Sequence, residues 1–187
     1  MKKNNGNAIF SAERAGSLET PLRRLFQNPK RILRRYITPG MTVLDFGCGP
    51  GFFTIEMAGI TGPAGKVIAA DMQQEMLEIV NNKIKKYNLG NIVEVWKCTE
   101  RSTGLSGKFD FILIFHVLHE LPDQAGFLKE VQTLLNQDGR ILLVEPQFHV
   151  SGKEFEELEG ELRKMRFEIT AKPGIFLSRS MLLKKKN

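Results

Sequence analysis

Four residues in the first third of the chain have the types and spacing of a cofactor-binding turn. Asp45 is followed by glycines at every second position, Gly47, Gly49 and Gly51. Glycine adopts positive φ angles without strain and lets a ligand approach the backbone closely. A helix that follows offers backbone N–H groups without partners inside the helix. The pattern predicts a loop that binds a nucleotide-like cofactor, and a glycine-rich turn without a ligand is the alternative.

Two common nucleotide-binding loops fit the sequence poorly. A dinucleotide fingerprint, Gly-x-Gly-x-x-Gly/Ala, needs a small third residue, and Phe52 stands there. A Walker loop needs Gly-x-x-x-x-Gly-Lys-Ser/Thr; the interval from Gly59 to Gly65 has the wrong spacing, and Val67 replaces the hydroxyl residue. An acid two residues before the first glycine suits a ligand with an ammonium group and no phosphate.

Asp71 ends the next expected strand, 24 residues after Gly47. A carboxylate about twenty residues beyond a glycine loop, at a strand end, can bind both hydroxyls of a ribose. A helix N-cap ahead of Gln73 is compatible with the same position. Met72 is placed to pack on an adenine ring.

Two of the three histidines, His116 and His119, follow an apolar strand. Histidine titrates near neutral pH and suits proton transfer. We expect His116 as the first candidate for a general base, with Glu145, His119 and His149 as further candidates. Alternatively, one histidine shapes the cofactor pocket and the other caps the next loop. The spacing is not His-Glu-x-x-His and no third ligand is evident, so no metal site is predicted.

The elements that must position these residues alternate between strand and helix beyond residue 40. Expected strands are Thr42–Phe46, Lys66–Ala70, Ile92–Trp96, Phe109–Phe115, Gly139–Glu145, Phe167–Ala171 and Leu177–Lys184. Expected helices are Phe52–Ile60, Gln73–Tyr87, Ala125–Leu135 and Lys153–Arg166. This alternation predicts an α/β fold with a parallel sheet, an antiparallel final pair, and a ligand site beyond the carboxyl ends of the strands.

The N-terminal 36 residues are expected to form a helical extension or lid, and residues 37–187 the cofactor-binding domain. A helical pattern runs from Leu18 to Tyr36, with Asn28 and Pro29 as N-cap and first helical residue. This segment carries six cations and no acid between residues 21 and 36: Arg23, Arg24, Lys30, Arg31, Arg34 and Arg35. We expect a solvated helix face with arginine stems packed on the domain, and RNA or an acidic protein as an alternative partner.

The composition is that of one ordinary globular domain. The chain has 187 residues, of which 42% are hydrophobic and 26% charged, which excludes disordered, collagen-like and coiled-coil classes. Apolar stretches fall short of the ~20 residues of a membrane span, and no signal peptide follows Met1, so no membrane insertion is expected. Cys48 and Cys98 cannot form a disulfide scaffold, and we expect a cytoplasmic protein with reduced thiols. The net charge of +6 permits an anionic partner without requiring one.

The motif from Asp45 to Gly51 resembles the first motif of class I S-adenosylmethionine (SAM) methyltransferases. Residues 109–123 and 134–145 resemble the fourth motif and the approach to the fifth strand of that family. The resemblance runs from about Lys30 to the C-terminus and is to the ubiquinone/menaquinone-biosynthesis-type methyltransferase domain in particular. It implies a Rossmann-like sheet of seven strands, mostly parallel with an antiparallel last strand and helices on both faces. It also implies SAM as cofactor and S-adenosylhomocysteine as product.

The resemblance further implies a set of cofactor contacts. Asp71 would bind the ribose. Where this family often has an Asp that accepts from the adenine amino group, this chain has Cys98 or Thr99, so a backbone group or the Thr99 hydroxyl takes that contact. The expected cofactor-binding residues are Asp45, Gly47, Cys48, Gly49, Gly51, Asp71, Met72, Cys98, Thr99, Phe115 and His116.

The expected activity is in-line transfer of the sulfonium methyl group to a nucleophilic acceptor, with a small molecule favoured. Such a displacement needs an acceptor held at attack distance with water excluded. The alternatives are an RNA or protein methyltransferase that uses the basic segment, a SAM-binding subunit that needs a partner, and a nucleotide-dependent oxidoreductase. The chain is expected to be a monomer or a homodimer.

Overall fold

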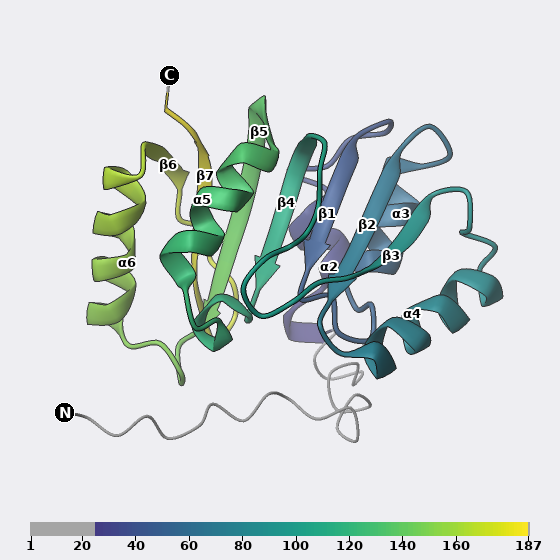
Figure 1. Cartoon of the computed structure of the whole chain (residues 1–187), viewed down its shortest axis with the longest axis horizontal. Helices are drawn as coiled ribbons and strands as arrows, with labels where there is room; N and C mark the ends of the chain where they lie inside the picture. The colour runs from purple at the N-terminus through teal and green to yellow at the C-terminus, as the bar shows by residue number, and fades with distance from the viewer. Residues whose placement is uncertain (1–24, 187) are drawn as a thin grey trace.

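The computed structural model describes residues 25–186, and a seven-stranded sheet forms its centre (Figure 1). Its strands lie in the order β3-β2-β1-β4-β5-β7-β6. Strands β1 to β5 are parallel to one another, and β7 runs antiparallel to both β5 and β6. The bounds are Thr42–Phe46 (β1), Lys66–Asp71 (β2), Val93–Lys97 (β3), Phe109–Phe115 (β4), Leu135–Pro146 (β5), Phe167–Ala171 (β6) and Ser178–Lys185 (β7). The predicted fold class is confirmed.

Helices cover both faces of this sheet (Figure 1). They are α2 (Pro29–Leu33), α3 (Thr54–Thr61), α4 (Gln74–Lys86), α5 (Gln124–Leu134) and α6 (Gly152–Lys164), with a 3-10 turn η2 (Leu118–Glu120). Leu33, Met57 and Val80, from α2, α3 and α4, belong to one buried cluster. Leu128 and Leu162, from α5 and α6, belong to another. The central strands are apolar on both faces because each face is covered.

Two elements differ from the sequence-based expectation. Residues 136–139 do not form a free turn, because β5 begins at Leu135 and pairs with Phe109 before a register shift. Gly139 makes this bulge possible, since an added Cβ would lie 2.8 Å from the Phe109 carbonyl oxygen. The expected helix from residue 18 to 36 is interrupted at residues 27–28 in its described part. Asn28 is extended there because it precedes a proline.

The described part of the predicted N-terminal extension packs into the domain. Leu33 is fully buried, and the Tyr36 ring stacks on Phe111 at a centroid distance of 5.9 Å. Asn28 caps α2 by accepting from the Arg31 backbone N–H, and Pro29 is the first helical residue, as predicted. Residues 1–24 of that extension, with Arg23 and Arg24, lie outside the described residues. Within residues 25–186, no helix is long and apolar enough to cross a bilayer.

Candidate active site

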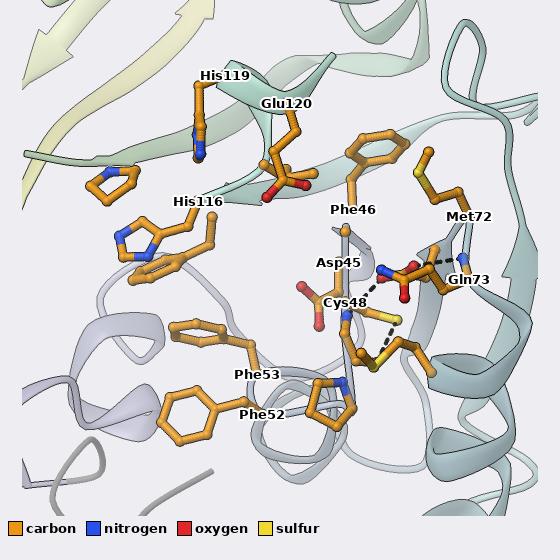
Figure 2. A pocket seen from close by; sticks show the side chains of 18 of the residues that line it. Asp45, Phe46, Cys48, Phe52, Phe53, Met72, Gln73, His116, His119 and Glu120 are labelled. Atoms are coloured by element: carbon orange, nitrogen blue, oxygen red, sulfur yellow. Dashed lines mark hydrogen bonds between the residues drawn. The ribbon is translucent and has the colours of Figure 1, made fainter. Parts of the chain in front are cut away.

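A cavity of about 560 Å³ opens at the carboxyl ends of the parallel strands. This volume is in the range of small-molecule sites. Its walls come from the loops after β1, β2, β3, β4 and β5, which are the five segments that the topology rule predicts. Figure 2 shows the two sides of the cavity: Met72 and Gln73 lie on one side, and His116, His119 and Glu120 on the other.

The loop after β1 is a glycine turn held against the end of β2. Gly47, Gly49 and Gly51 all have positive φ angles, of 69°, 52° and 88°. The backbone N–H groups of Gly47 and Cys48 both donate to the Ala70 carbonyl oxygen, at 2.8 and 3.0 Å. Gly51 does not line the cavity; an added Cβ there would lie 3.2 Å from Val80, so this glycine allows close packing against α4.

Two buried carboxylates border this turn. Asp45 is 2% exposed, and Thr54 Oγ1 donates to its Oδ2 at 2.6 Å. Asp71 is 6% exposed and accepts backbone N–H groups from Gly49 and Gln73, each at 2.9 Å. Burial raises the pKa of Asp71, although these backbone hydrogen bonds oppose the shift. A carboxylate has about four acceptor sites, so Asp71 retains capacity for a ligand hydroxyl.

The loop after β3 contributes Cys98 and Thr99 to the lining of the cavity, to which Met72 also belongs. The Thr99 hydroxyl is engaged in its own turn, since it donates to the Ser102 carbonyl oxygen at 3.2 Å and accepts from the Ser102 N–H at 3.1 Å. Of the two adenine contacts expected here, this favours a backbone group. Burial raises the pKa of Cys98 to about 12, so its thiol remains protonated and contributes a small, weakly polar surface.

Cys48 is buried in the glycine turn, and its thiol has a similar environment. Burial, together with the negative charges of Asp45 and Asp71, raises the pKa of Cys48 well above its ordinary value. A protonated thiol is a poor nucleophile. Cys48 therefore acts as a small residue that fits the turn.

The loop after β4 brings two histidines to the cavity. His116 has a φ angle of 59°, an uncommon value for a residue with a side chain, and its Nε2 lies 2.8 Å from Ser178 Oγ. His119 Nδ1 lies 2.5 Å from Glu145 Oε2, and the other Glu145 oxygen accepts from the Leu118 N–H at 3.0 Å. Glu145 is 1% exposed. A buried carboxylate thus fixes the His119 ring with a proton on Nδ1.

The charges around His119 set its protonation. Burial by itself lowers the pKa of this histidine. The hydrogen bond and charge of Glu145, with the nearby charge of Glu120, outweigh burial and raise the pKa above its ordinary value. Burial also raises the pKa of Glu120, and the His119 charge opposes that rise. The His149 ring lies 5.3 Å from the His119 ring, on the same rim.

Most of the predicted site residues meet at this cavity. Ten of the eleven expected cofactor-binding residues line it, all except Gly51. His119 and His149 also line it, but Glu145 does not. Glu145 lies behind His119 and opens instead on a second cavity of about 510 Å³ between α5 and α6. The catalytic candidate Glu145 thus contacts His119 without lining the main cavity. Among the described residues, no group of His, Cys, Asp or Glu side chains is arranged to hold a metal ion.

Four residues at the mouth of the cavity were not predicted as site residues: Phe26, Gln27, Phe176 and Leu177. Phe26 and Phe176 stack at a centroid distance of 4.6 Å, and Gln27 Nε2 donates to the Phe176 carbonyl oxygen at 2.9 Å. Phe148 and Leu177 complete this part of the lining. Phe26 and Gln27 lie about 120 to 150 positions before Phe148, Phe176 and Leu177, so no local pattern connects the two groups.

Comparison with known proteins agrees with this geometry. The model of a family described as "Methyltransferase domain" matches residues 37–177. Demethylmenaquinone methyltransferase from Lactococcus lactis subsp. lactis (strain IL1403) is 34% identical over 106 residues, which are 57% of this chain and 42% of that protein. Ubiquinone/menaquinone biosynthesis C-methyltransferase from Hahella chejuensis (strain KCTC 2396) is 29% identical over 110 residues, 58% of this chain and 44% of that protein. This chain matches less than half the length of these curated relatives.

A solved structure matches over nearly the whole chain. A SAM-dependent methyltransferase from Aquifex aeolicus has a TM-score of 0.84 and 26% identity, and the match covers 94% of this chain and 98% of that one. The predicted resemblance to class I SAM methyltransferases of the ubiquinone/menaquinone type is therefore confirmed. Because the family model covers most of the sheet and every loop around the cavity except residues 25–28, the chain belongs to the methyltransferase domain family.

Proposed function

We propose that this chain binds SAM in the cavity and transfers its methyl group to a small, apolar acceptor that carries an acidic hydroxyl or carbon. The observation that carries the proposal is that His119, held by the buried Glu145, lines the same cavity as the glycine turn. A base beside a cofactor loop is what methylation of an acidic acceptor requires. The mouth of the same cavity is apolar, which suits an acceptor with an apolar body.

The residues of the cavity fit SAM in charge and shape. Bound SAM supplies a methyl group on a positively charged sulfur, which is already activated for transfer. We assign Asp45 and the glycine turn to the amino-acid end of SAM, because a buried carboxylate suits an ammonium group. Asp71 is assigned to the ribose hydroxyls, and Met72 to the adenine ring. Cys48, Cys98, Thr99 and Phe115 complete the proposed wall.

The two histidines have different proposed roles. His119 accepts the acceptor's proton at Nε2, because Glu145 holds Nδ1 and stabilises the resulting positive charge. The raised pKa makes His119 a stronger base than an ordinary histidine. His116, expected first as the base, is assigned to orienting the acceptor, since Ser178 holds its Nε2. Phe115 and Phe53, whose rings lie 4.5 Å apart, help to exclude water.

The names of the relatives indicate the acceptor class. Demethylmenaquinone methyltransferases, by name, methylate demethylmenaquinone, which is a quinone. We propose a reduced quinone-type ring as the acceptor of this chain too, with carbon as the methylated atom. An RNA acceptor is not favoured, because apolar side chains rather than cations form the mouth of the cavity.

Calorimetric titration with SAM, S-adenosylhomocysteine and NAD tests the cofactor assignment. The two sulfur compounds should bind at micromolar concentration, and NAD should not. Asp71→Ala should weaken SAM binding by about 1.5–3 kcal/mol, the range for loss of a charged hydrogen-bond partner. Asp123→Ala is the matched control, because Asp123 also accepts a backbone N–H but caps α5 outside the cavity. Equal affinity of both variants would remove Asp71 from the site.

The acceptor class is tested with SAM that carries a labelled methyl group. A reduced naphthoquinone without its ring methyl group, transfer RNA and a mixed protein fraction are offered separately. Label in the naphthoquinone extract supports the proposal, and label confined to RNA or protein contradicts it. Loss of transfer in His119→Gln, with SAM affinity retained, would support the assigned base.

A further inference from the structure

Exposed apolar side chains gather at one place on the described surface, the mouth of the cavity. We call Phe26, Phe148, Phe176 and Leu177 the apolar rim; their exposed fractions are 49%, 78%, 47% and 42%. Among the described residues, only two other large hydrophobic side chains are exposed to this degree. One is Leu25, which precedes Phe26, and the other is Tyr87 at the end of α4. Such a concentration marks an interaction surface rather than scattered exposure.

The apolar rim is a preformed surface. The rings of Phe26 and Phe176 stack, and Gln27 holds the Phe176 carbonyl oxygen. The loop that carries Phe148 is joined to the same surface, because the Gln147 N–H donates to the Leu177 carbonyl oxygen at 3.1 Å. Three separate segments are thus held together around one opening. Binding to this surface therefore costs little conformational entropy.

Positive charge borders the apolar rim. Helix α2 begins three residues after Phe26 and carries Lys30 and Arg31, and Arg34 and Arg35 follow directly after its end; all four are exposed. No acid occurs between residues 25 and 44, so nothing on this segment neutralises these cations. Apolar side chains that can enter the headgroup region, beside lysine and arginine that attract anionic headgroups, form a surface suited to an anionic bilayer.

We propose that the apolar rim and the exposed side of α2 dock this protein on the surface of an anionic lipid bilayer. The proposal rests on the proposed function: an apolar acceptor dissolves in lipid, and docking turns the mouth of the cavity toward it. The rim side chains enter the headgroup layer, and the α2 cations contact lipid phosphates. The contact is peripheral, since no described helix can span a bilayer.

Flotation of the full-length protein with lipid vesicles tests this proposal. The protein should float with vesicles that contain phosphatidylglycerol, float less with phosphatidylcholine alone, and detach as salt is raised. Phe148→Ser combined with Phe176→Ser should lower the partition coefficient on the order of tenfold, because two phenyl groups lose their apolar contact. Lys30→Glu combined with Arg31→Glu should lower it by at least about tenfold, because two attractive charges become repulsive.

Helix α4 supplies matched controls. Tyr87→Ser removes another exposed aromatic ring, and Lys85→Glu with Lys86→Glu reverses two exposed lysines away from the mouth of the cavity. These variants should float like the unaltered protein. Equal losses in the control and rim variants, or equal flotation with both lipids, would overturn the proposal. Dissociation of a dimer by the rim variants in lipid-free centrifugation would also overturn it, and would identify the rim as a self-association surface.

The failure of this proposal can be separated from failure of the proposed function. The variant with Lys30→Glu and Arg31→Glu does not alter the cavity lining and should bind SAM normally in calorimetry. Normal SAM binding and methyl transfer without vesicle binding would reject only the docking surface. Absence of SAM binding by the unaltered protein would reject the proposed function instead.

Discussion

At the scale of single residues, the contact between His119 and Glu145 is the basis of the proposed chemistry of the cavity. A buried carboxylate that fixes Nδ1 leaves Nε2 as the nitrogen that can take a proton. The sequence shows both residues as candidates but not their relation, since 26 positions separate them. Only the adjacent ends of β4 and β5 bring them together. Glu145, named as a possible catalytic group, supports its neighbour instead.

Glu145→Gln should lower the pKa of His119. The amide keeps a similar shape but removes the negative charge that raises this pKa. A base works when deprotonated, so the methyl-transfer rate should rise with pH through the His119 pKa, and this rise should move to lower pH in the variant. Nuclear magnetic resonance titration of the three histidines measures the pKa directly. An unchanged His119 titration would contradict the pairing.

The same pair links stability to pH. The folded state holds the His119 proton more tightly than the unfolded state, because its folded pKa is raised. The resulting stabilisation is present below the ordinary histidine pKa, about 6.5, and is lost as pH rises through the folded-state pKa. The stability advantage of the unaltered protein over Glu145→Gln should shrink over that interval.

At the scale of elements, the turn after β1 shows how closely the loops pack. Gly47 needs its positive φ, and an added Cβ would lie 2.7 Å from Val117, a residue of the loop after β4. Two loops that border the cavity therefore meet at this glycine. The glycines and the preceding apolar strand predicted the turn. The contact between Gly47 and Val117 could not be predicted from them.

Gly47→Ala should destabilise the protein by roughly 2–4 kcal/mol, since backbone strain and overpacking add. SAM affinity should also fall at least about tenfold, because the turn must move. Gly62→Ala is the matched control: its φ is 65°, but nothing lies within 4 Å of its added Cβ. This control should cost about 1–3 kcal/mol of strain, because φ 65° with ψ −171° is a conformation that almost only glycine adopts, and it should leave SAM affinity unchanged. Denaturant unfolding and calorimetry measure both quantities. Equal effects of the two variants would show that the Val117 contact is unimportant.

The bounds of an element were predicted correctly where a short apolar run is flanked by residues typical of turns. The predicted and observed bounds of β1, β4 and β6 are identical. The prediction was wrong where strand pairing decided the boundary: β5 starts earlier than expected because it pairs with Phe109. The N-cap at Asn28, with Pro29 as the first helical residue, was predicted correctly.

At the scale of the whole molecule, the cavity joins the two halves of the fold. The loops after β1, β2 and β3 hold the turn and the proposed adenosine end, and the loops after β4 and β5 hold the histidines. A ligand across this edge contacts both halves in the folded state only. Binding must therefore raise the stability of the whole domain.

SAM at about one hundred times its dissociation constant should stabilise the protein by about 2.7 kcal/mol, a rise of roughly 5–10 °C in Tm. Trp96, the one tryptophan of the chain, reports unfolding by fluorescence, because its Nε1 donates to the Thr103 carbonyl oxygen beside the proposed adenine loop. Circular dichroism should give the same Tm. NAD should produce no shift, and an equal shift with NAD would contradict the cofactor assignment.

The sequence by itself determined the class of sheet, the glycine turn, the acid at the end of β2 and the family. These are local patterns, because strand periodicity and glycine spacing are written in consecutive residues. The tertiary structure alone decided that Glu145 supports His119, that Gly51 packs against α4 and that Phe26 meets Phe176. Each of these depends on contacts between distant segments. Such contacts depend on the register of neighbouring strands and on the packing of helices. They cannot be predicted from the order of residues within one short segment.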